Sequence, residues 1–156
     1  NMMIEQGIRY DVVDAVFADE RNDDLVDIYA RCKAFNAYVV LPEAEAVIQA
    51  SIRVCNLCKK IETEVAISSA LFADPAEQEL HDVLIRLNKE LIPDIVTYNY
   101  AGALKLAEQV VDPVNKFFDS VMVMDENVDI KNNRLALLEQ AKEVTNAVGD
   151  LSCIVL

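Results

Sequence analysis

Glycine and proline are scarce in this 156-residue chain, which contains three glycines, four prolines and no tryptophan. Little glycine, together with abundant alanine, leucine, glutamate and aspartate, favours helices. No stretch combines the alternating pattern of a β-strand with flanking turn residues. The sequence therefore predicts an all-α protein.

Long apolar runs are also missing. No run approaches the roughly 18 residues that are needed to cross a bilayer. The opening "NMMIEQG" has neither the basic nor the apolar region of a signal peptide. We expect a cytoplasmic protein without a membrane partner. Because an Asn precedes Met2, we also expect residues 1–3 to derive from an expression vector and the chain to be a fragment of a longer protein.

Positive charge is in deficit, with 14 lysines and arginines against 27 aspartates and glutamates, a net charge of −13. DNA, RNA and membrane surfaces are polyanionic, so this balance excludes a generally basic binding surface. We expect no DNA partner. Any contact with nucleic acid requires a local basic patch, and its binding should be weak and sensitive to salt.

Apolar residues recur at the three- and four-residue spacing of helices along most of the chain. Helix start signals are clear at Asp74-Pro75, where Glu77 completes a capping box, and again at Asp112-Pro113. No flexible linker divides the pattern, so we expect residues 1–156 to form one domain, a bundle of six to seven helices with short loops. The expected helices span about 7–20, 25–41, 43–67, 75–93, 98–111, 114–124 and 130–148, the last one terminated by Gly149.

Two of the four cysteines form a Cys-x-x-Cys pair in "RVCNLCKK", residues 53–60. Cys55 and Cys58 fall in the middle of the apolar arc of the expected third helix, with Val54, Ile61 and Val65. Core packing is the favoured interpretation, because free cysteine packs as a small hydrophobe. A metal site with Cys32 and Cys153 and a redox pair are the alternatives, but both usually need turns or a helix N-terminus.

The opposite face of the same helix is polar and carries Gln49, Arg53, Asn56 and Lys60. Residues 31–60 contain five cations and two acids, a net charge of +3, so the remaining residues together carry −16. Such a local basic face can contact phosphates, while amide side chains can read base edges of an unstacked loop. An ordinary solvated helix face is the alternative.

No catalytic set is apparent. The chain has one histidine, His81, which reads as a surface helix residue, and it has no glycine-rich phosphate loop. Arg134 interrupts an apolar stripe, so we expect its head to pair with Asp119 or Asp125, with RNA contact as the alternative. Tyr98 and Tyr100 are expected either to stack on bases or to line the core.

Six segments carry a family resemblance when taken in order: "GIRYDVVDAV", "DDLVDIYARCKAF", "RVCNLCKK", "LFADPAEQEL", "FFDSVMVM" and "NNRLALL". Together they closely resemble the C-terminal domain of the bacterial-type glycyl-tRNA synthetase β subunit. That domain is DALR-like and belongs to the helical anticodon-binding group, which also occurs in arginyl-tRNA synthetases. The resemblance covers essentially the whole chain.

The resemblance implies a tRNA(Gly) anticodon-binding module without a catalytic site or cofactor of its own. Aminoacylation, with ATP and Mg, would take place on the synthetase α subunit, and the partners would be tRNA(Gly), the rest of the β subunit and that α subunit. A structural or protein-interaction bundle within the synthetase is the alternative. The residues expected to contact RNA are Gln49, Arg53, Asn56, Lys59, Lys60, Arg31 and Lys33.

The chain departs from the family at several positions. Members resemble one another as "ANKRVSNIL(K/A)K" where this chain reads "ASIRVCNLCKK", so one expected basic group is missing at Ile52. Cys55 and Cys58 replace Ser and Leu, which supports the packing interpretation. The end "GDLSCIVL" stands where members read like "ADISLL".

Overall fold

The computed structural model describes residues 7–17 and 24–155. Within these ranges all regular structure is helical and no strand occurs, so the predicted all-α class is confirmed. Positions 1–3, 18–20 and 156 of the predicted elements lie outside the described residues. The α-helices are α2 (Tyr10–Phe17), α3 (Leu25–Tyr38), α4 (Ala44–Cys58), α5 (Pro75–Val96), α6 (Tyr100–Ala107), α7 (Val111–Ser120) and α8 (Val128–Thr145). Three short 3-10 helices are η1 (Ser69–Leu71), η2 (Glu108–Val110) and η3 (Leu151–Cys153).

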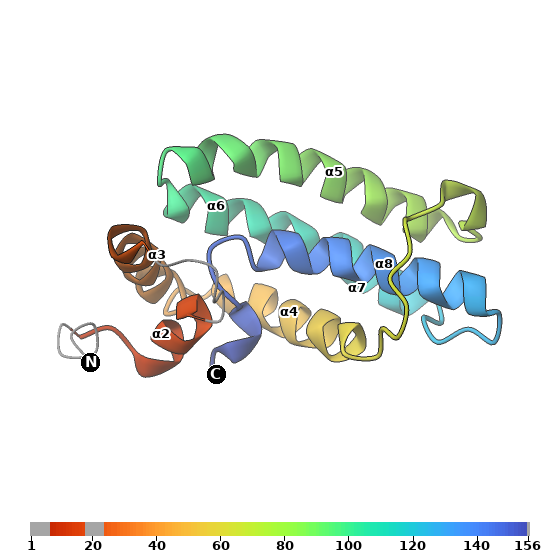
Figure 1. The fold of residues 1–156 in the computed structure, drawn as a ribbon, viewed down its shortest axis with the longest axis horizontal. Coiled ribbons are helices and arrows are strands. Elements are labelled where there is room, and N and C mark those ends of the chain that lie inside the picture. The colour runs from red at the N-terminus through yellow and green to blue at the C-terminus, as the bar shows by residue number, and fades with distance from the viewer. Residues whose placement is uncertain (1–6, 18–23, 156) are drawn as a thin grey trace.

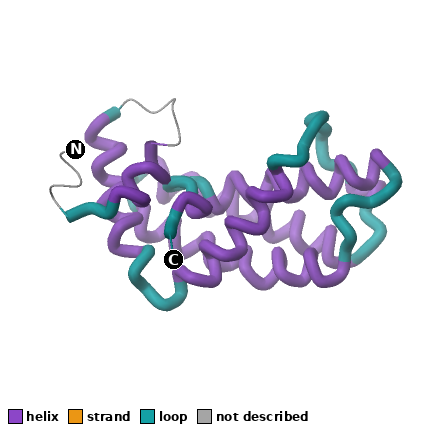
Figure 2. Tube along the Cα trace, turned by 90° about the horizontal axis from the view of Figure 1, so that it is seen from below, coloured by secondary structure: helices purple, strands orange, loops and turns teal. Residues whose placement is uncertain are grey.

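Four long helical rods form the body of the molecule. They are α4, α5, the α6–η2–α7 stretch and α8, and successive rods run in opposite directions (Figure 1). α4 packs against α8 and α7, and α5 packs against α6, α7 and α8. α2, α3 and η3 gather at one end of these rods, and the tube view shows helix along nearly the whole body (Figure 2).

One apolar cluster runs through the described residues from Ile8 near α2 to Ile154 after η3. Phe35 of α3 and Leu84 of α5 are buried in it. Helical spacing would also place Phe17 and Leu25 on the inward faces of their helices, but 42% and 71% of their surfaces are exposed. Each is a terminal residue of its helix, where the apolar stripe extends beyond the neighbouring helices.

α4 ends at Cys58, well before the predicted end near residue 67. Glu62 and Glu64 would disfavour further helix, because acidic side chains oppose the negative C-terminal end of the helix dipole. The β-branched residues that follow at every second position (Ile61, Thr63, Val65 and Ile67) favour an extended chain. Val65 therefore lies on this extended segment with 39% of its surface exposed, and not in the core as predicted.

α5 begins as the sequence predicts. The Asp74 carboxylate accepts from the Ala76 amide at 2.9 Å, and Glu77 Oε1 accepts from the Asp74 amide at 3.2 Å, which completes the capping box. Pro93 does not end the helix, which continues to Val96. The carbonyl of Pro93 remains paired, because it accepts from the Thr97 amide at 3.0 Å and from the Thr97 hydroxyl at 2.7 Å.

The second predicted cap is wrong. Helical structure continues through η2 into α7, whose N-cap is Val110 and not Asp112. Pro113 is the third residue of α7, within its first turn, where a proline is tolerated. The "VMVM" segment is not the end of α7, since Val121 is already extended (φ −128°, ψ 136°).

α8 also ends earlier than predicted, at Thr145. Gly149 follows a turn and packs against α2: a Cβ on Gly149 would lie 3.3 Å from Val16 Cγ2. The Asp150 amide donates to the Ala15 carbonyl at 3.0 Å. Gly149 therefore permits close approach of the C-terminal segment to α2 and does not terminate α8.

Candidate nucleic-acid interface

The outward face of α4 brings together five of the seven predicted contact residues. Gln49, Arg53 and Asn56 lie on the exposed face of the helix, Lys59 is its C-cap and Lys60 is in the following turn. All five side chains are exposed. We call these five residues the α4 face.

The two lysines of the α4 face lie at the C-terminal end of the helix. Unpaired carbonyl groups make this end partly negative, which favours a cation even without a ligand. Lys59 and Lys60 therefore have a local structural reason to be there. Glu62 and Glu64 follow directly and are exposed, so the positive charge is confined to a small area.

Arg53 contacts two residues of α7, and the sequence did not predict that α7 would lie next to the α4 face. Its guanidinium carbon lies 4.3 Å from the ring centroid of Phe118, above the ring. Its Nη1 donates to Asn115 Oδ1 at 3.3 Å. The sequence hints at this contact only through the pair Phe117-Phe118. Phe117 lies on the inward face of α7 and is fully buried. Phe118 lies beside that face and is half-buried, so its ring is available to a neighbouring helix.

The other two predicted contact residues, Arg31 and Lys33, belong to α3, which lies beyond the opposite end of α4 from Lys60 (Figure 1). Lys33 is exposed. Arg31 is largely engaged within the chain: its Nε donates to Asp27 Oδ2 at 2.8 Å and its Nη1 donates to the Ala147 carbonyl at 2.7 Å. Its guanidinium also lies over the Tyr100 ring at 4.6 Å. Arg31 thus joins α3, α6 and the turn after α8.

The two tyrosines have different environments. Tyr100 is 2% exposed and its hydroxyl donates to Asp27, so it lines the core. Burial and, to a smaller extent, the hydrogen bond to Asp27 together raise the pKa of Tyr100 to about 12. Tyr98 is 60% exposed and has a positive φ of 58°. Its ring meets that of Tyr100 edge to face, with centroids 6.2 Å apart.

Cys55 and Cys58 are buried, as the helical geometry predicted. Burial and, to a smaller extent, the nearby Glu139 carboxylate together raise the pKa of the Cys58 thiol to about 12. Burial likewise raises the pKa of Cys32 to about 11. A thiolate is the form that attacks electrophiles and binds metals. Within 7–17 and 24–155, no group of three His, Cys, Asp or Glu side chains could hold a metal ion.

Arg134 is buried, with 6% of its surface exposed. Its Nη1 donates to the Met122 carbonyl at 2.7 Å and lies 3.5 Å from Asp125 Oδ2, one of the two predicted partners. Its Nη2 lies 3.2 Å from Glu77 Oε1, a contact that the sequence did not predict. The structure therefore gives Arg134 an internal role, in which it connects α8 to the start of α5 and to the loop before α8.

Asn133, next to Arg134, is also a buried polar residue, with 1% of its surface accessible. Its side-chain Oδ1 accepts from the Ser68 amide at 2.7 Å and its Nδ2 donates to the Ser68 carbonyl at 3.1 Å. These two bonds fix the end of the extended segment 61–68 on α8.

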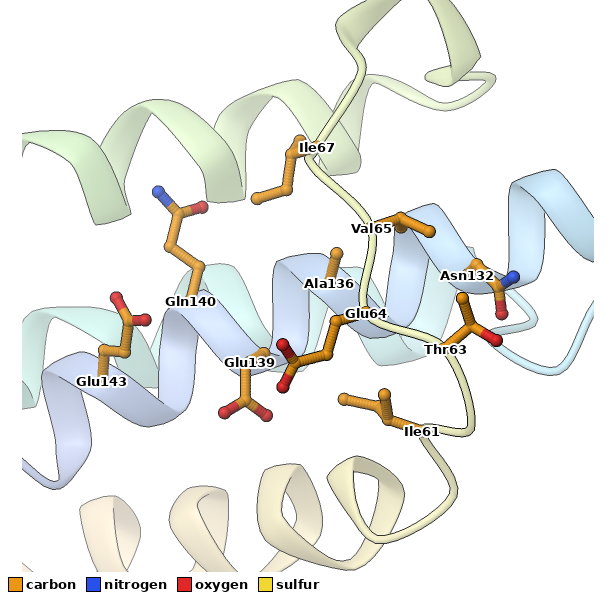
Figure 3. Close-up of a pocket in the computed structure, with 10 residues that line it drawn as sticks. All are labelled: Ile61, Thr63, Glu64, Val65, Ile67, Asn132, Ala136, Glu139, Gln140 and Glu143. Atoms are coloured by element: carbon orange, nitrogen blue, oxygen red, sulfur yellow. The ribbon is translucent and has the colours of Figure 1, made fainter.

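A pocket of about 380 Å³ lies between this extended segment and α8. Figure 3 shows Ile61, Val65 and Ile67 on the segment side and the acidic side chains Glu64, Glu139 and Glu143 around the opening. Gln140 of α8 lines this pocket as well, and its Oε1 lies 3.0 Å from Nδ1 of His81. His81 belongs to α5 and is half-buried. The three carboxylates make this pocket unsuited to a phosphate group.

A comparison with known protein families is consistent with this all-helical fold. A family model described as "DALR anticodon binding domain" matches residues 47–151, from α4 to η3, and the chain belongs to this family. No helix within the described residues is long and apolar enough to cross a membrane.

Similar individual proteins define the relationship more narrowly than the family model does. A glycine–tRNA ligase beta subunit of Desulforamulus reducens is 38% identical over 152 residues, which cover 97% of this chain and 22% of that protein. A protein of the same description from Janthinobacterium sp. is 34% identical over 154 residues, with shares of 97% and 22%. One from Colwellia psychrerythraea is 35% identical over 152 residues, with shares of 96% and 22%. The chain is therefore homologous to a domain-sized part of glycine–tRNA ligase beta subunits.

Proposed function

We propose that this chain is one domain, residues 1–156, that binds the anticodon region of tRNA(Gly) as part of a glycine–tRNA ligase beta subunit. Its family membership gives the class of ligand, and the names of its relatives give the particular tRNA. The observation that carries the proposal is the α4 face. Arg53, Asn56 and Lys60 match the family pattern at this face, and all three are exposed there.

The α4 face supplies the groups that an unstacked RNA loop requires. Lys59 and Lys60 contact phosphates, because lysine presents a flexible point charge. Gln49 and Asn56 read base edges, since each amide offers both donors and an acceptor. Gln49 Nε2 now donates to Glu45 Oε1 at 3.3 Å, and a base edge would replace this exposed partner. Arg31 and Lys33 belong to a separate part of the surface, at α3.

The whole enzyme would perform the chemistry elsewhere. In this proposal the chain positions the tRNA, while aminoacylation with ATP and Mg takes place on the α subunit. Its protein partners are that α subunit and the rest of the β subunit, and its location is the cytoplasm. The domain itself holds no cofactor.

A titration of in vitro transcribed tRNA(Gly) against the 156-residue chain tests the proposal. We expect saturable binding at low salt that weakens at moderate salt and that is at least tenfold weaker in the double variant Arg53→Glu/Lys60→Glu. The matched control is Arg86→Glu/Lys89→Glu, which makes the same charge change on exposed positions of α5. Equal binding by the wild type and the Arg53→Glu/Lys60→Glu variant would show that the site is elsewhere.

An interaction bundle without RNA contact is the second candidate, and one surface favours it. Leu25 and Val26 at the start of α3 are 71% and 79% exposed, and Val96 and Tyr98 after α5 are 71% and 60% exposed. A pocket of about 300 Å³ that Val96 and Tyr98 line also includes Asp24, next to Leu25. If the wild-type chain binds no tRNA(Gly) at low salt, this second function is the one to pursue.

A further inference from the structure

The contact of Arg53 with α7 limits what its side chain can offer to RNA. The Phe118 ring covers one side of the guanidinium at 4.3 Å, and the hydrogen bond to Asn115 uses one of its five N–H donors. Arg53 is nevertheless an exposed residue, and its hydrogen bond to Asn115 is itself exposed, which leaves the side of the guanidinium away from Phe118 for a ligand. The group is therefore fixed in orientation and open on one side.

A guanidinium held in this way differs from a free surface cation. Its planar group can stack on an aromatic ring on one side and on a nucleic-acid base on the other, because every base has a π-face. Lysine lacks the plane and cannot replace it in this role. Single-stranded RNA is commonly recognised by bases that stack on aromatic rings or on arginine.

We propose that Arg53 binds RNA as a stacking platform for one unpaired base, with Phe118 and Asn115 as the positioning residues that hold it. The interface then includes an edge of α7 in addition to the α4 face. This inference rests on the proposed function, since it names how the same surface takes its ligand. The competing role for Arg53 is a simple phosphate contact.

The two roles differ in the effect of Arg53→Lys. A phosphate contact tolerates this change because the charge is kept, whereas a stacking platform loses the stacked base. We expect Arg53→Lys to weaken binding of the tRNA(Gly) transcript about 5- to 150-fold, the range measured for single stacked bases. The dependence of log K on log salt should keep its slope, since the charge is unchanged. Arg86→Lys, at another exposed arginine with an amide partner, Gln109, is the matched control.

Phe118→Leu tests the positioning role, because leucine keeps apolar packing but removes the ring. We expect Phe118→Leu alone to weaken binding of the tRNA(Gly) transcript. Added to Arg53→Lys, it should weaken binding no further, because either change alone already removes the same stacking platform. Phe72→Leu is the matched control, at another half-buried ring. Asn115→Ala, which removes only the hydrogen bond, provides a second positioning variant if Phe118→Leu lowers the thermal stability of the chain.

A direct readout uses tRNA(Gly) with 2-aminopurine placed in turn at each loop position. One position should lose fluorescence on binding to the wild type through stacking, and should keep it with Arg53→Lys at saturating protein. The inference is overturned if Arg53→Lys binds like the wild type while Arg53→Glu does not, because Arg53 then acts by charge alone. If the wild type binds no tRNA at all, the proposed function fails, and the stacking role fails with it.

Discussion

At the scale of single residues, Arg134 carries a charge inside the bundle and depends on its partners there. Its guanidinium lies between Glu77, which is fully buried, and Asp125, with contact distances of 3.2 and 3.5 Å. Removing one partner of a buried ion pair leaves an uncompensated charge in a medium of low polarity. The stability of the chain should therefore be sensitive to Arg134 and much less sensitive to its exposed arginines.

We predict that Arg134→Met lowers the free energy of unfolding by about 3–5 kcal/mol. The double variant Arg134→Met/Glu77→Gln should be more stable than Arg134→Met, since it removes the orphaned charge and glutamine keeps the capping box. Urea denaturation followed by circular dichroism measures both. Arg86→Met, which breaks an exposed pair with Glu90, should cost no more than about 1 kcal/mol. An equally small effect at Arg134 would contradict the internal role.

The buried thiols predict a pH dependence. Burial raises the pKa of Cys32 to about 11 and that of Cys58 to about 12 from an ordinary value of 9.0. In the unfolded chain these thiols lose their protons above pH 9, while in the folded chain they keep them. The stabilisation is thus complete below pH 9 and is lost as the pH rises from 9 through about 11 for Cys32 and through about 12 for Cys58.

We therefore expect the free energy of unfolding to fall by on the order of 1 kcal/mol per thiol at pH 10 relative to pH 8. Denaturant titrations at these two pH values test this. The variant Cys32→Ala/Cys58→Ala should be less stable at pH 8, because it leaves cavities, but should lose less stability between the two pH values. An increase in stability toward pH 10 in the wild type would contradict the assignment.

The sequence predicts whether a side chain points inward when that direction depends only on the residue's position in its own helix. The inward direction of Cys55, Cys58 and Arg134 follows from helical spacing alone. The partner Asp125 lies nine positions away and was foreseen, whereas Glu77 is 57 positions away and could not be. Asn133 shows the same limit, because its partner Ser68 belongs to a segment that was expected to be a helix end or a short loop.

At the scale of elements, some helices begin where a local side chain caps the first backbone amides by hydrogen bonds. Asp24 caps α3, with its carboxylate accepting from the Val26 amide at 3.0 Å, and Asp74 caps α5. The sequence predicted the Asp74 cap. Asp112-Pro113 has the same letters as Asp74-Pro75 but lies within a continuous helical stretch, because packing of η2 and α7 against α4 and α5 prevails over the local signal.

We predict that Asp74→Ala lowers the free energy of unfolding by about 1 kcal/mol, within the range of about 0.5–2 kcal/mol for a lost N-cap. Asp112→Ala should have an effect below about 0.5 kcal/mol, since its side chain is exposed and it is not the N-cap of α7. Thermal denaturation of both variants provides the comparison. Equal losses would mean that Asp112 caps a helix after all.

At the scale of the whole molecule, charge and packing together support the proposed interface. The chain carries −13 overall, yet the segment of residues 31–60 carries +3. The sequence could locate this segment and the outward face of α4, but not the side-by-side packing of α4 and α7. That packing joins Arg53 to Asn115 and Phe118, 62 and 65 positions away.

The central claim is that RNA binds at α4 and the adjoining edge of α7. Nuclear magnetic resonance of the 17.4-kDa chain, with backbone amides observed during titration with a tRNA(Gly) anticodon stem–loop, tests it most directly. We predict that the largest shift changes fall on residues 49–60 and on Asn115 and Phe118, with little change on α5. Shift changes concentrated on the start of α3 and around Tyr98, with none on α4, would contradict this account.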